Sequence, residues 1–289
     1  MNYSVYSYTK DALKKMPSRK DDSHKGDYGR LLCICGSEGM CGAAYLAAKA
    51  AYRTGAGLVR ILTPRENLIP LQTLLPEAIV TVYDGSLSDR SVILDSVDWA
   101  DAIVIGCGLG RSSVSRQILS TVLRYSEKPT VVDADGLNLI SSNPALKKYL
   151  SGKIITPHIL EMSRLCGLSV EDINSGRETA AYEFSHKTGC VCALKSHRTC
   201  VADGSDRVYV NNSGNNGMAT AGSGDVLAGI IGGILAQNKS GSLSLSDTAA
   251  LGVYIHGLAG DTAAEDLGKY SLMATDIIEA LPNVLCLIS

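Results

Sequence analysis

Residues 226–236 form an apolar run without a charged side chain, and a glycine-rich stretch, residues 214–224, comes directly before it. A helix that is apolar on every side must lie in the core of a protein. The glycines let the backbone turn tightly and approach a ligand closely. The first N–H groups of a helix have no partner within the helix, and the helix dipole adds positive potential there. The sequence therefore predicts a buried helix whose amino end is an anion-binding turn.

Asp225 stands at the mouth of this turn, next to Gly224. A carboxylate repels an anion, so an acidic residue is a poor choice for anion binding alone. As a base, Asp225 would take the proton from a hydroxyl group that attacks phosphorus, while the amides at Gly222 and Gly224 stabilise the charge that develops. The simpler alternative is that Asp225 only caps the helix, because Asp is favoured at the N-cap.

Short apolar runs alternate with helical segments along most of the chain. Because these runs lack polar alternation, they are typical of parallel strands that helices cover on both faces. Strands are expected at residues 30–36, 58–63, 79–82, 101–106, 130–133 and 153–155, and helices at residues 41–54, 113–126, 135–142, 225–237, 246–265 and 275–285.

Residues 191–195, 199–203 and 207–210 are three further strands close together, and the turn signal Asp203-Gly204 separates two of them. They predict an antiparallel meander near one edge of the sheet. Residues 1–25 are expected to be a polar lead-in with some helix. The 289 residues are therefore expected to form one domain, residues 1–289, with a doubly wound α/β architecture of three layers, α/β/α.

The formal net charge is −2, which gives no electrostatic reason to expect a nucleic acid or an anionic membrane as a partner. Residues 1–30 contain no apolar stretch typical of a signal peptide, and residues 226–236 are too short to span a bilayer, so a cytoplasmic protein is expected. The nine cysteines include no Cys-x-x-Cys pair. We interpret them as small buried side chains in a reducing compartment rather than as zinc ligands.

Two other strand-to-helix turns consist of small residues. Gly106, Gly108 and Gly110 follow one expected strand, and residues 36–44 follow another. Small side chains leave room for a ligand against the backbone. The alternative for both is a tight turn or close packing between helix and sheet, and a lone Gly-x-Gly is weak evidence for a nucleotide.

Polar residues follow two more strands, at the edge where the carboxyl ends of parallel strands meet. Asp133, Asp135 and Asn138 fit the support of a Mg²⁺–phosphate site, or else an ordinary pair of caps. His158 and Glu161 are three residues apart and would share one face of a helix. We expect His158 to face the substrate and Glu161 to face a metal-bound water; the alternative is a surface pair.

Residues 195–199, Lys-Ser-His-Arg-Thr, end another strand. Their cations would meet phosphates, or they would form the solvated tip of a hairpin. Position in a loop does not decide between the two.

In this order, the motifs resemble those of the NAD(P)H-hydrate dehydratases of the ribokinase-like superfamily. The resemblance extends over residues 25–282 and rests on residues 25–29, 36–44, 133–138, 156–161 and 214–229. It implies a ribokinase-like fold and an enzyme that repairs damaged nicotinamide cofactor. Such enzymes remove water from the hydrated rings of NADHX and NADPHX, and they use ADP, with AMP as product, or ATP. Here the resemblance implies ADP, or ATP, and Mg²⁺.

The resemblance also implies roles for individual residues. Asp225 would remove the proton of the ring hydroxyl, whose oxygen then attacks the terminal phosphoryl group, and phosphate would leave. The hydrate would be bound by Ala43, Gly108, His158 and Asp225, the nucleotide by Lys195, Ser196, His197, Arg198, Thr199 and Gly224, and a metal ion by Glu161 through a water. A homo-oligomer is expected. Epimerisation is expected from a separate protein, because residues 1–25 are too short for an epimerase domain.

Two other functions stay open. A ribokinase-like kinase for a vitamin precursor alcohol would keep Asp225 and the anion-binding turn but would stop at the phosphorylated product. Such kinases usually have Asn where this chain has His158. The second is a binding module that senses adenylate without catalysis, which Asp225 together with Gly222 and Gly224 disfavours.

Overall fold

The structure of the chain is a computed structural model that describes residues 3–85 and 89–288. Its strands form one sheet in the order β1-β10-β9-β8-β7-β6-β5-β2-β3-β4. Neighbouring strands from β4 across to β8 are parallel, β9 is antiparallel to β8 and β10, and β1 is parallel to β10. The strands are β1 (Ser4–Tyr6), β2 (Arg30–Ile34), β3 (Leu58–Pro64), β4 (Ile79–Tyr83), β5 (Ala102–Ile105), β6 (Thr130–Val132), β7 (Ile154–Ile155), β8 (Val191–Leu194), β9 (Cys200–Ala202) and β10 (Arg207–Val210).

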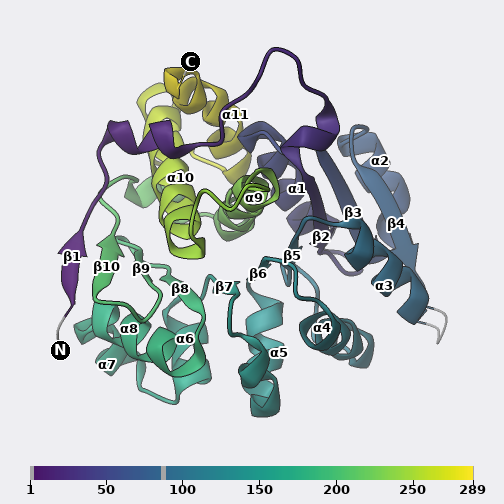
Figure 1. Ribbon diagram of the computed structural model, residues 1–289, viewed down its shortest axis with the longest axis horizontal. Helices are drawn as coiled ribbons and strands as arrows, with labels where there is room; N and C mark the ends of the chain where they lie inside the picture. The colour runs from purple at the N-terminus through teal and green to yellow at the C-terminus, as the bar shows by residue number, and fades with distance from the viewer. Residues whose placement is uncertain (1–2, 86–88, 289) are drawn as a thin grey trace.

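Helices cover both faces of the sheet, and together they make the three layers seen in Figure 1. One face is covered by α1 (Cys41–Thr54), α2 (Leu68–Leu74), α9 (Ser223–Gln237), α10 (Leu245–Leu267) and α11 (Ala274–Leu285). The other face is covered by α3 (Asp89–Trp99), α4 (Ser113–Tyr125), α5 (Asp135–Ser142), α6 (Ile159–Cys166), α7 (Val170–Ser175) and α8 (Arg177–Thr188).

The core lies in two layers, one on each side of the sheet. Along β2, Leu31 and Cys33 pack into the layer under α1 and α9, whereas Leu32 and Ile34 pack into the layer under α3 and α4. All four side chains are fully buried. Both faces of a central parallel strand are therefore apolar, which explains why the sequence of β2 shows no polar alternation.

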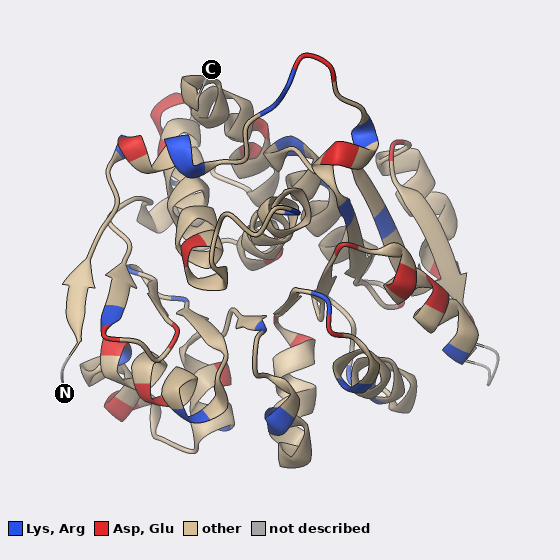
Figure 2. Ribbon diagram, in the orientation of Figure 1, with Lys and Arg blue, Asp and Glu red and all other residues tan. Residues whose placement is uncertain are grey.

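Helix α9 is the buried helix that the sequence predicts, and it packs closely on α1. A Cβ at Gly229 would overlap the carbonyl group of Ala47, and a Cβ at Gly233 would lie 2.9 Å from the carbonyl oxygen of Ala51. These glycines let the two helix backbones touch. Within residues 3–85 and 89–288, no helix is long and apolar enough to cross a membrane. Lysine, arginine, aspartate and glutamate are interspersed along the elements (Figure 2).

The prediction for the first part of the chain was incomplete. Lys10–Lys15 is a short 3-10 helix, as expected in outline, but Ser4–Tyr6 forms β1 at the edge of the sheet. The ring of Tyr6 packs against that of Tyr209 on β10, with 5.6 Å between centroids. Only this partner strand, far away in sequence, makes the short segment a strand. The predicted antiparallel meander is confirmed as β8, β9 and β10.

Candidate functional site

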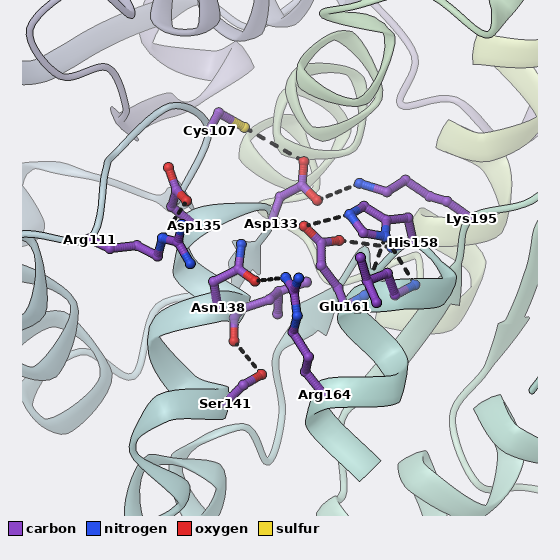
Figure 3. A network of polar contacts seen from close by, with 12 residues as sticks. Cys107, Arg111, Asp133, Asp135, Asn138, Ser141, His158, Glu161, Arg164 and Lys195 are labelled. Atoms are coloured by element: carbon purple, nitrogen blue, oxygen red, sulfur yellow. Dashed lines mark hydrogen bonds and ion pairs between the residues drawn. The ribbon is translucent and has the colours of Figure 1, made fainter. Parts of the chain in front are cut away.

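The carboxyl ends of β5, β6 and β8 meet the amino end of α9, and polar side chains converge there (Figures 1 and 3). Asp133 directly follows β6 and is 1% exposed. Lys195, which follows β8, donates a hydrogen bond from Nζ to Asp133 Oδ1 at 2.6 Å. Cys107, which follows β5, donates from Sγ to Asp133 Oδ2 at 3.8 Å. The convergence follows from the topology, because adjacent parallel strands end at the same edge of the sheet.

Asp225 lies in the first turn of α9 and faces this cluster. A carboxylate oxygen of Asp225, one of Asp133 and the Sγ of Cys107 all lie within 4.8 Å of one another. Burial, followed by the charge of Asp133, raises the pKa of Asp225 to about 6. At neutral pH Asp225 is therefore mostly ionised, and its pKa is high enough for it to act as a base.

The N-cap of α9 is Gly222, so the interpretation of Asp225 as a mere N-cap was wrong. Gly222 has a φ of 88°, in the left-handed region that glycine adopts without strain. Within residues 3–85 and 89–288, the backbone N–H groups of Gly224 and Asp225 have no hydrogen-bond acceptor. Two unpaired amides thus stand beside the Asp225 carboxylate, at the turn for which the sequence predicts anion binding; that role stays a prediction.

The ion pair between Lys195 and Asp133 lies against this turn. A Cβ at Gly224 would be 3.3 Å from Lys195 Nζ and 3.8 Å from Asp133 Oδ2, so a larger residue would crowd the pair. Burial alone would lower the pKa of Lys195, but the charges of Asp133 and Glu161 outweigh burial and raise this pKa. Lys195 is therefore a cation next to the unpaired amides.

His158 and Glu161 cap the start of α6 together. His158 Nδ1 accepts from the N–H groups of Leu160 and Glu161 at 3.1 and 3.2 Å, and Glu161 Oε2 accepts from the N–H of His158 at 2.8 Å. The second Glu161 oxygen lies 3.3 Å from His158 Nε2. The side chain of His158 is 48% exposed but that of Glu161 only 4%, so the pair is not the surface pair of the alternative interpretation. Burial raises the pKa of Glu161 to about 7.

In the loop between β8 and β9, the side chain of Lys195 lies in a different environment from those of the residues that follow it. Lys195 turns inward to Asp133, whereas His197 and Arg198 are exposed. The loop is closed by its own hydrogen bonds: Arg198 N donates to Ser196 Oγ at 3.2 Å, and Thr199 Oγ1 donates to the carbonyl of Ser196 at 3.3 Å. The role of these residues in binding a nucleotide stays a prediction.

Comparison with known proteins adds to this geometry. A family model described as NAD(P)H-hydrate dehydratase matches residues 31–283. The chain belongs to the NAD(P)H-hydrate dehydratase family. It is 41% identical over 266 residues to the bifunctional NAD(P)H-hydrate repair enzyme Nnr of Escherichia coli, a match that covers 92% of this chain and 49% of that protein. It is 37% identical over 268 residues to the ADP-dependent (S)-NAD(P)H-hydrate dehydratase of Neisseria meningitidis, covering 91% of this chain and 87% of that one. The chain spans about half the length of the bifunctional relatives that it matches.

Solved structures confirm the predicted ribokinase-like α/β fold of this dehydratase-family chain. A ribokinase-like superfamily protein from Enterococcus faecalis is 33% identical with a TM-score of 0.87, over 99% of this chain and 96% of that one. The ADP/ATP-dependent NAD(P)H-hydrate dehydratase of Bacillus subtilis, co-crystallised with ATP and Mg²⁺, is 27% identical with a TM-score of 0.82, over 97% and 98% of the two chains.

Two residues predicted for the hydrate site of this dehydratase-family chain touch each other. A Cβ at Gly108 would lie 2.7 Å from the Cβ of Ala43, and Gly108 has a φ of 59°. The turn after β5 therefore packs on the first turn of α1 only because residue 108 has no side chain. His158 and Lys195 form an isolated parallel β-bridge, so His158 lies beside the ion pair. Burial lowers the pKa of His158, and the positive charge of Lys195 lowers it further. Their contact with the hydrate stays a prediction.

Sequence reasoning missed three residues of the site. The sequence predicts Cys107 only as one of nine small buried cysteines, yet its Sγ lies within 4.8 Å of carboxylate oxygens of both Asp133 and Asp225. Ala134 joins Asp133 to α5 with a φ of 46°, a left-handed conformation that nothing in the sequence announces. His256 lies 3.3 Å from Ser223 Oγ, the first residue of α9. The sequence pattern that could have indicated a role for His256 is a single histidine among the apolar residues of α10.

Proposed function

We propose that the chain is an ADP-dependent (S)-NAD(P)H-hydrate dehydratase, which phosphorylates the ring hydroxyl of NADHX or NADPHX and then eliminates phosphate. The observation that carries the proposal is the Asp225 carboxylate beside the unpaired N–H groups of Gly224 and Asp225. This arrangement pairs a base with an oxyanion cradle, as phosphoryl transfer to a hydroxyl group requires. Membership of the family and the name of the neisserial relative support the substrate class.

The reaction follows from the positions of these groups. Asp225 removes the proton from the ring hydroxyl, and the hydroxyl oxygen attacks the terminal phosphorus of ADP, which releases AMP. The amides of Gly224 and Asp225 hold the oxygens of the phosphoryl group, and Lys195 adds a positive charge beside them. The bond between the ring carbon and oxygen then breaks, because phosphate is a far better leaving group than hydroxide. The phosphate departs with the bonding electrons, and the neighbouring ring carbon loses a proton to water, so the electrons of that C–H bond form the ring double bond and restore the dihydronicotinamide.

The two ligands approach the cradle from different elements. We assign the nucleotide to residues 195–199 and Gly224, where the loop after β8 meets the amino end of α9. We assign the hydrated ring to Ala43, Gly108 and His158, at the starts of α1 and α6 and in the turn after β5. Asp225 stands at the amino end of α9 to serve both.

The charges of the site fit a divalent cation. Within the described residues, the carboxyl groups of Asp133, Asp225 and Glu161 all interact with the ammonium group of Lys195, and the guanidinium of Arg164 adds a second positive charge near Glu161 alone. The raised pKa values of Asp225 and Glu161 show that ionising them is costly, and a nearby cation would lower that cost. Glu161, through a water, and Asp133 are the residues that would hold Mg²⁺. When bound, Mg²⁺ would neutralise charge on the phosphoryl group during transfer.

The test is an assay of NADHX with ADP or ATP in the presence of Mg²⁺, in which the absorbance of the reduced ring is followed. The wild-type protein is expected to restore this absorbance. Asp225→Asn is expected to lower the rate by roughly 10²- to 10⁴-fold, because it removes the general base. Asp266→Asn, an exposed carboxylate at the end of α10, is the matched control and is expected to be fully active.

The rival functions give other outcomes. A small-molecule kinase would consume nucleotide with an alcohol and accumulate a phosphorylated product. An adenylate-binding module would bind nucleotide equally well with and without Asp225→Asn and would show no turnover. Absence of recovery with both nucleotides would contradict the proposal.

We further propose that the enzyme acts in the cytoplasm as a homo-oligomer, with a separate epimerase upstream. The (S) specificity in the name of the neisserial relative supports the epimerase, since the other epimer of the hydrate must first be converted. Light scattering tests the oligomer. Complete repair of a mixture of epimers by this chain alone would contradict the need for an epimerase.

A further inference from the structure

The glycine-rich turn before α9 lies directly on α10. A Cβ at Gly257 would overlap the side chain of Ser213, and a Cβ at Gly260 would overlap that of Met218. Ser213 also donates from Oγ to the carbonyl of Tyr254 at 3.0 Å. The turn therefore takes its position from α10, which has glycines where the two segments touch.

Asp261 of α10 holds the start of the turn. Its Oδ2 accepts from the N–H of Gly214 at 2.7 Å, and its Oδ1 accepts from Asn215 Nδ2 at 3.0 Å. Asn215 in turn accepts on Oδ1 from the N–H of Gly217 at 3.0 Å. One carboxylate thus orders both the backbone and the capping side chain at the beginning of the turn.

His256 of α10 reaches the other end of the turn. Its Nε2 lies 3.3 Å from the Oγ of Ser223, the first residue of α9. Burial lowers the pKa of His256 to about 4, so the ring is neutral near pH 7. A neutral ring with its proton on Nε2 donates to Ser223 Oγ and leaves the hydroxyl proton available for an anion.

We infer that Asp261 and His256 are positioning residues for the nucleotide phosphate: α10 holds both ends of the glycine-rich turn, so that the Ser223 hydroxyl and the Gly224 amide serve the same oxyanion. Neither residue touches the reacting atoms. The inference rests on the proposed function for the identity of the anion, the outermost phosphate of an adenine nucleotide.

The test is calorimetry with ADP, together with separate KM values for ADP and for the hydrate. Asp261→Ala removes both anchoring hydrogen bonds and is expected to raise the Kd for ADP about tenfold or more. Asp261→Asn keeps an acceptor for the N–H of Gly214, so it is expected to recover part of the affinity. The KM for the hydrate is expected to stay within about twofold of the wild-type value, since the anchored turn belongs to the phosphate side. Glu265→Gln, exposed on the same helix, is the matched control and is expected to bind ADP normally.

A double-mutant cycle tests the route through Ser223. His256→Ala is expected to weaken ADP binding. His256→Gln is expected to recover part of the ADP affinity, because its amide N–H can still donate to Ser223. In the Ser223→Ala background, His256→Ala is expected to cause no further loss of ADP affinity. Additive effects in this cycle, or a rise in the hydrate KM equal to the rise in the ADP Kd, would overturn the inference. An unchanged ADP affinity of Ser223→Ala would also overturn it, even where a His256 variant does not fold.

Calorimetry needs no turnover, so the two proposals fail separately. A wild-type protein that binds ADP but does not repair NADHX contradicts the proposed function, while the ADP affinities of the variants still decide the role of α10.

Discussion

The change Asp133→Asn tests the electrostatics of the site most directly. Asp133 is buried next to Asp225 and is the first charged group that raises the pKa of Asp225, after burial itself. Asparagine keeps the shape and an acceptor oxygen for Lys195 but removes the negative charge. The ionised form of Asp225 is then repelled less, and the charge of Lys195, no longer neutralised, attracts it more. Both effects lower the pKa of Asp225.

The size of the shift follows from the separation of the carboxylates. At 4.8 Å, the upper limit of the distance between the two groups, two unit charges interact with about 0.9 kcal/mol at a dielectric constant of 80 and about 3.5 kcal/mol at 20. These energies correspond to about 0.6 and 2.5 pKa units. Because Asp225 is only partly buried, we expect a shift of about one unit downward.

The assay is the pH dependence of kcat/KM for the hydrate at saturating nucleotide. The activity of the wild-type protein is expected to fall as the pH drops through the pKa of Asp225, which is about 6 without ligands and lower once Mg²⁺ is bound, because Asp225 must be ionised to act as a base. In Asp133→Asn this acidic limb is expected to move about one unit lower. Asp135→Asn is the graded control: Asp135 contributes least among the named causes, so it is expected to give a smaller shift in the same direction. An acidic limb that stays in place or moves upward would refute the reasoning.

Three further predictions concern stability and are checked by urea unfolding. Asp225→Asn is expected to raise the free energy of unfolding at pH 7 by roughly 1–3 kcal/mol. The pKa of Asp225 rises from 3.8 to about 6 on folding, so the folded state loses stability as the pH increases through that interval and Asp225 ionises. Asparagine does not ionise and avoids this loss, and no gain is expected at pH 3, where Asp225 is protonated in both states. Lys195→Met is expected to lower the free energy of unfolding by about 3–5 kcal/mol, because it leaves the buried charge of Asp133 without its cation. A loss below about 1 kcal/mol would contradict this. Ala134→Gly is expected to stabilise the protein by about 1 kcal/mol, because glycine relieves the left-handed strain at φ 46°; a destabilised variant would show that the strain is absent.

Much of the fold could be predicted because its signals are local. The continuous apolar runs of β2, β5 and β6 belong to strands buried on both faces, and the uncharged run after Gly224 belongs to a helix buried on every side. The glycine turn before α9 was recognised for the same reason, since a chain can bend there only where side chains are missing. Strand β1 was missed because three residues become a strand only when β10 offers them an edge.

The chemistry of the site depends on groups that lie far apart along the chain. Lys195 and Asp133 are 62 residues apart, yet their ion pair supplies the charge that tunes Asp225. Asp261 reaches back 47 residues to anchor Gly214. The sequence therefore specified the strands, the helices and the phosphate turn, each through a pattern of neighbouring residues. The pKa of Asp225 arises from burial and from charges that folding brings together, and the glycine-rich turn is held by hydrogen bonds and packing from α10. No local sequence pattern encodes either.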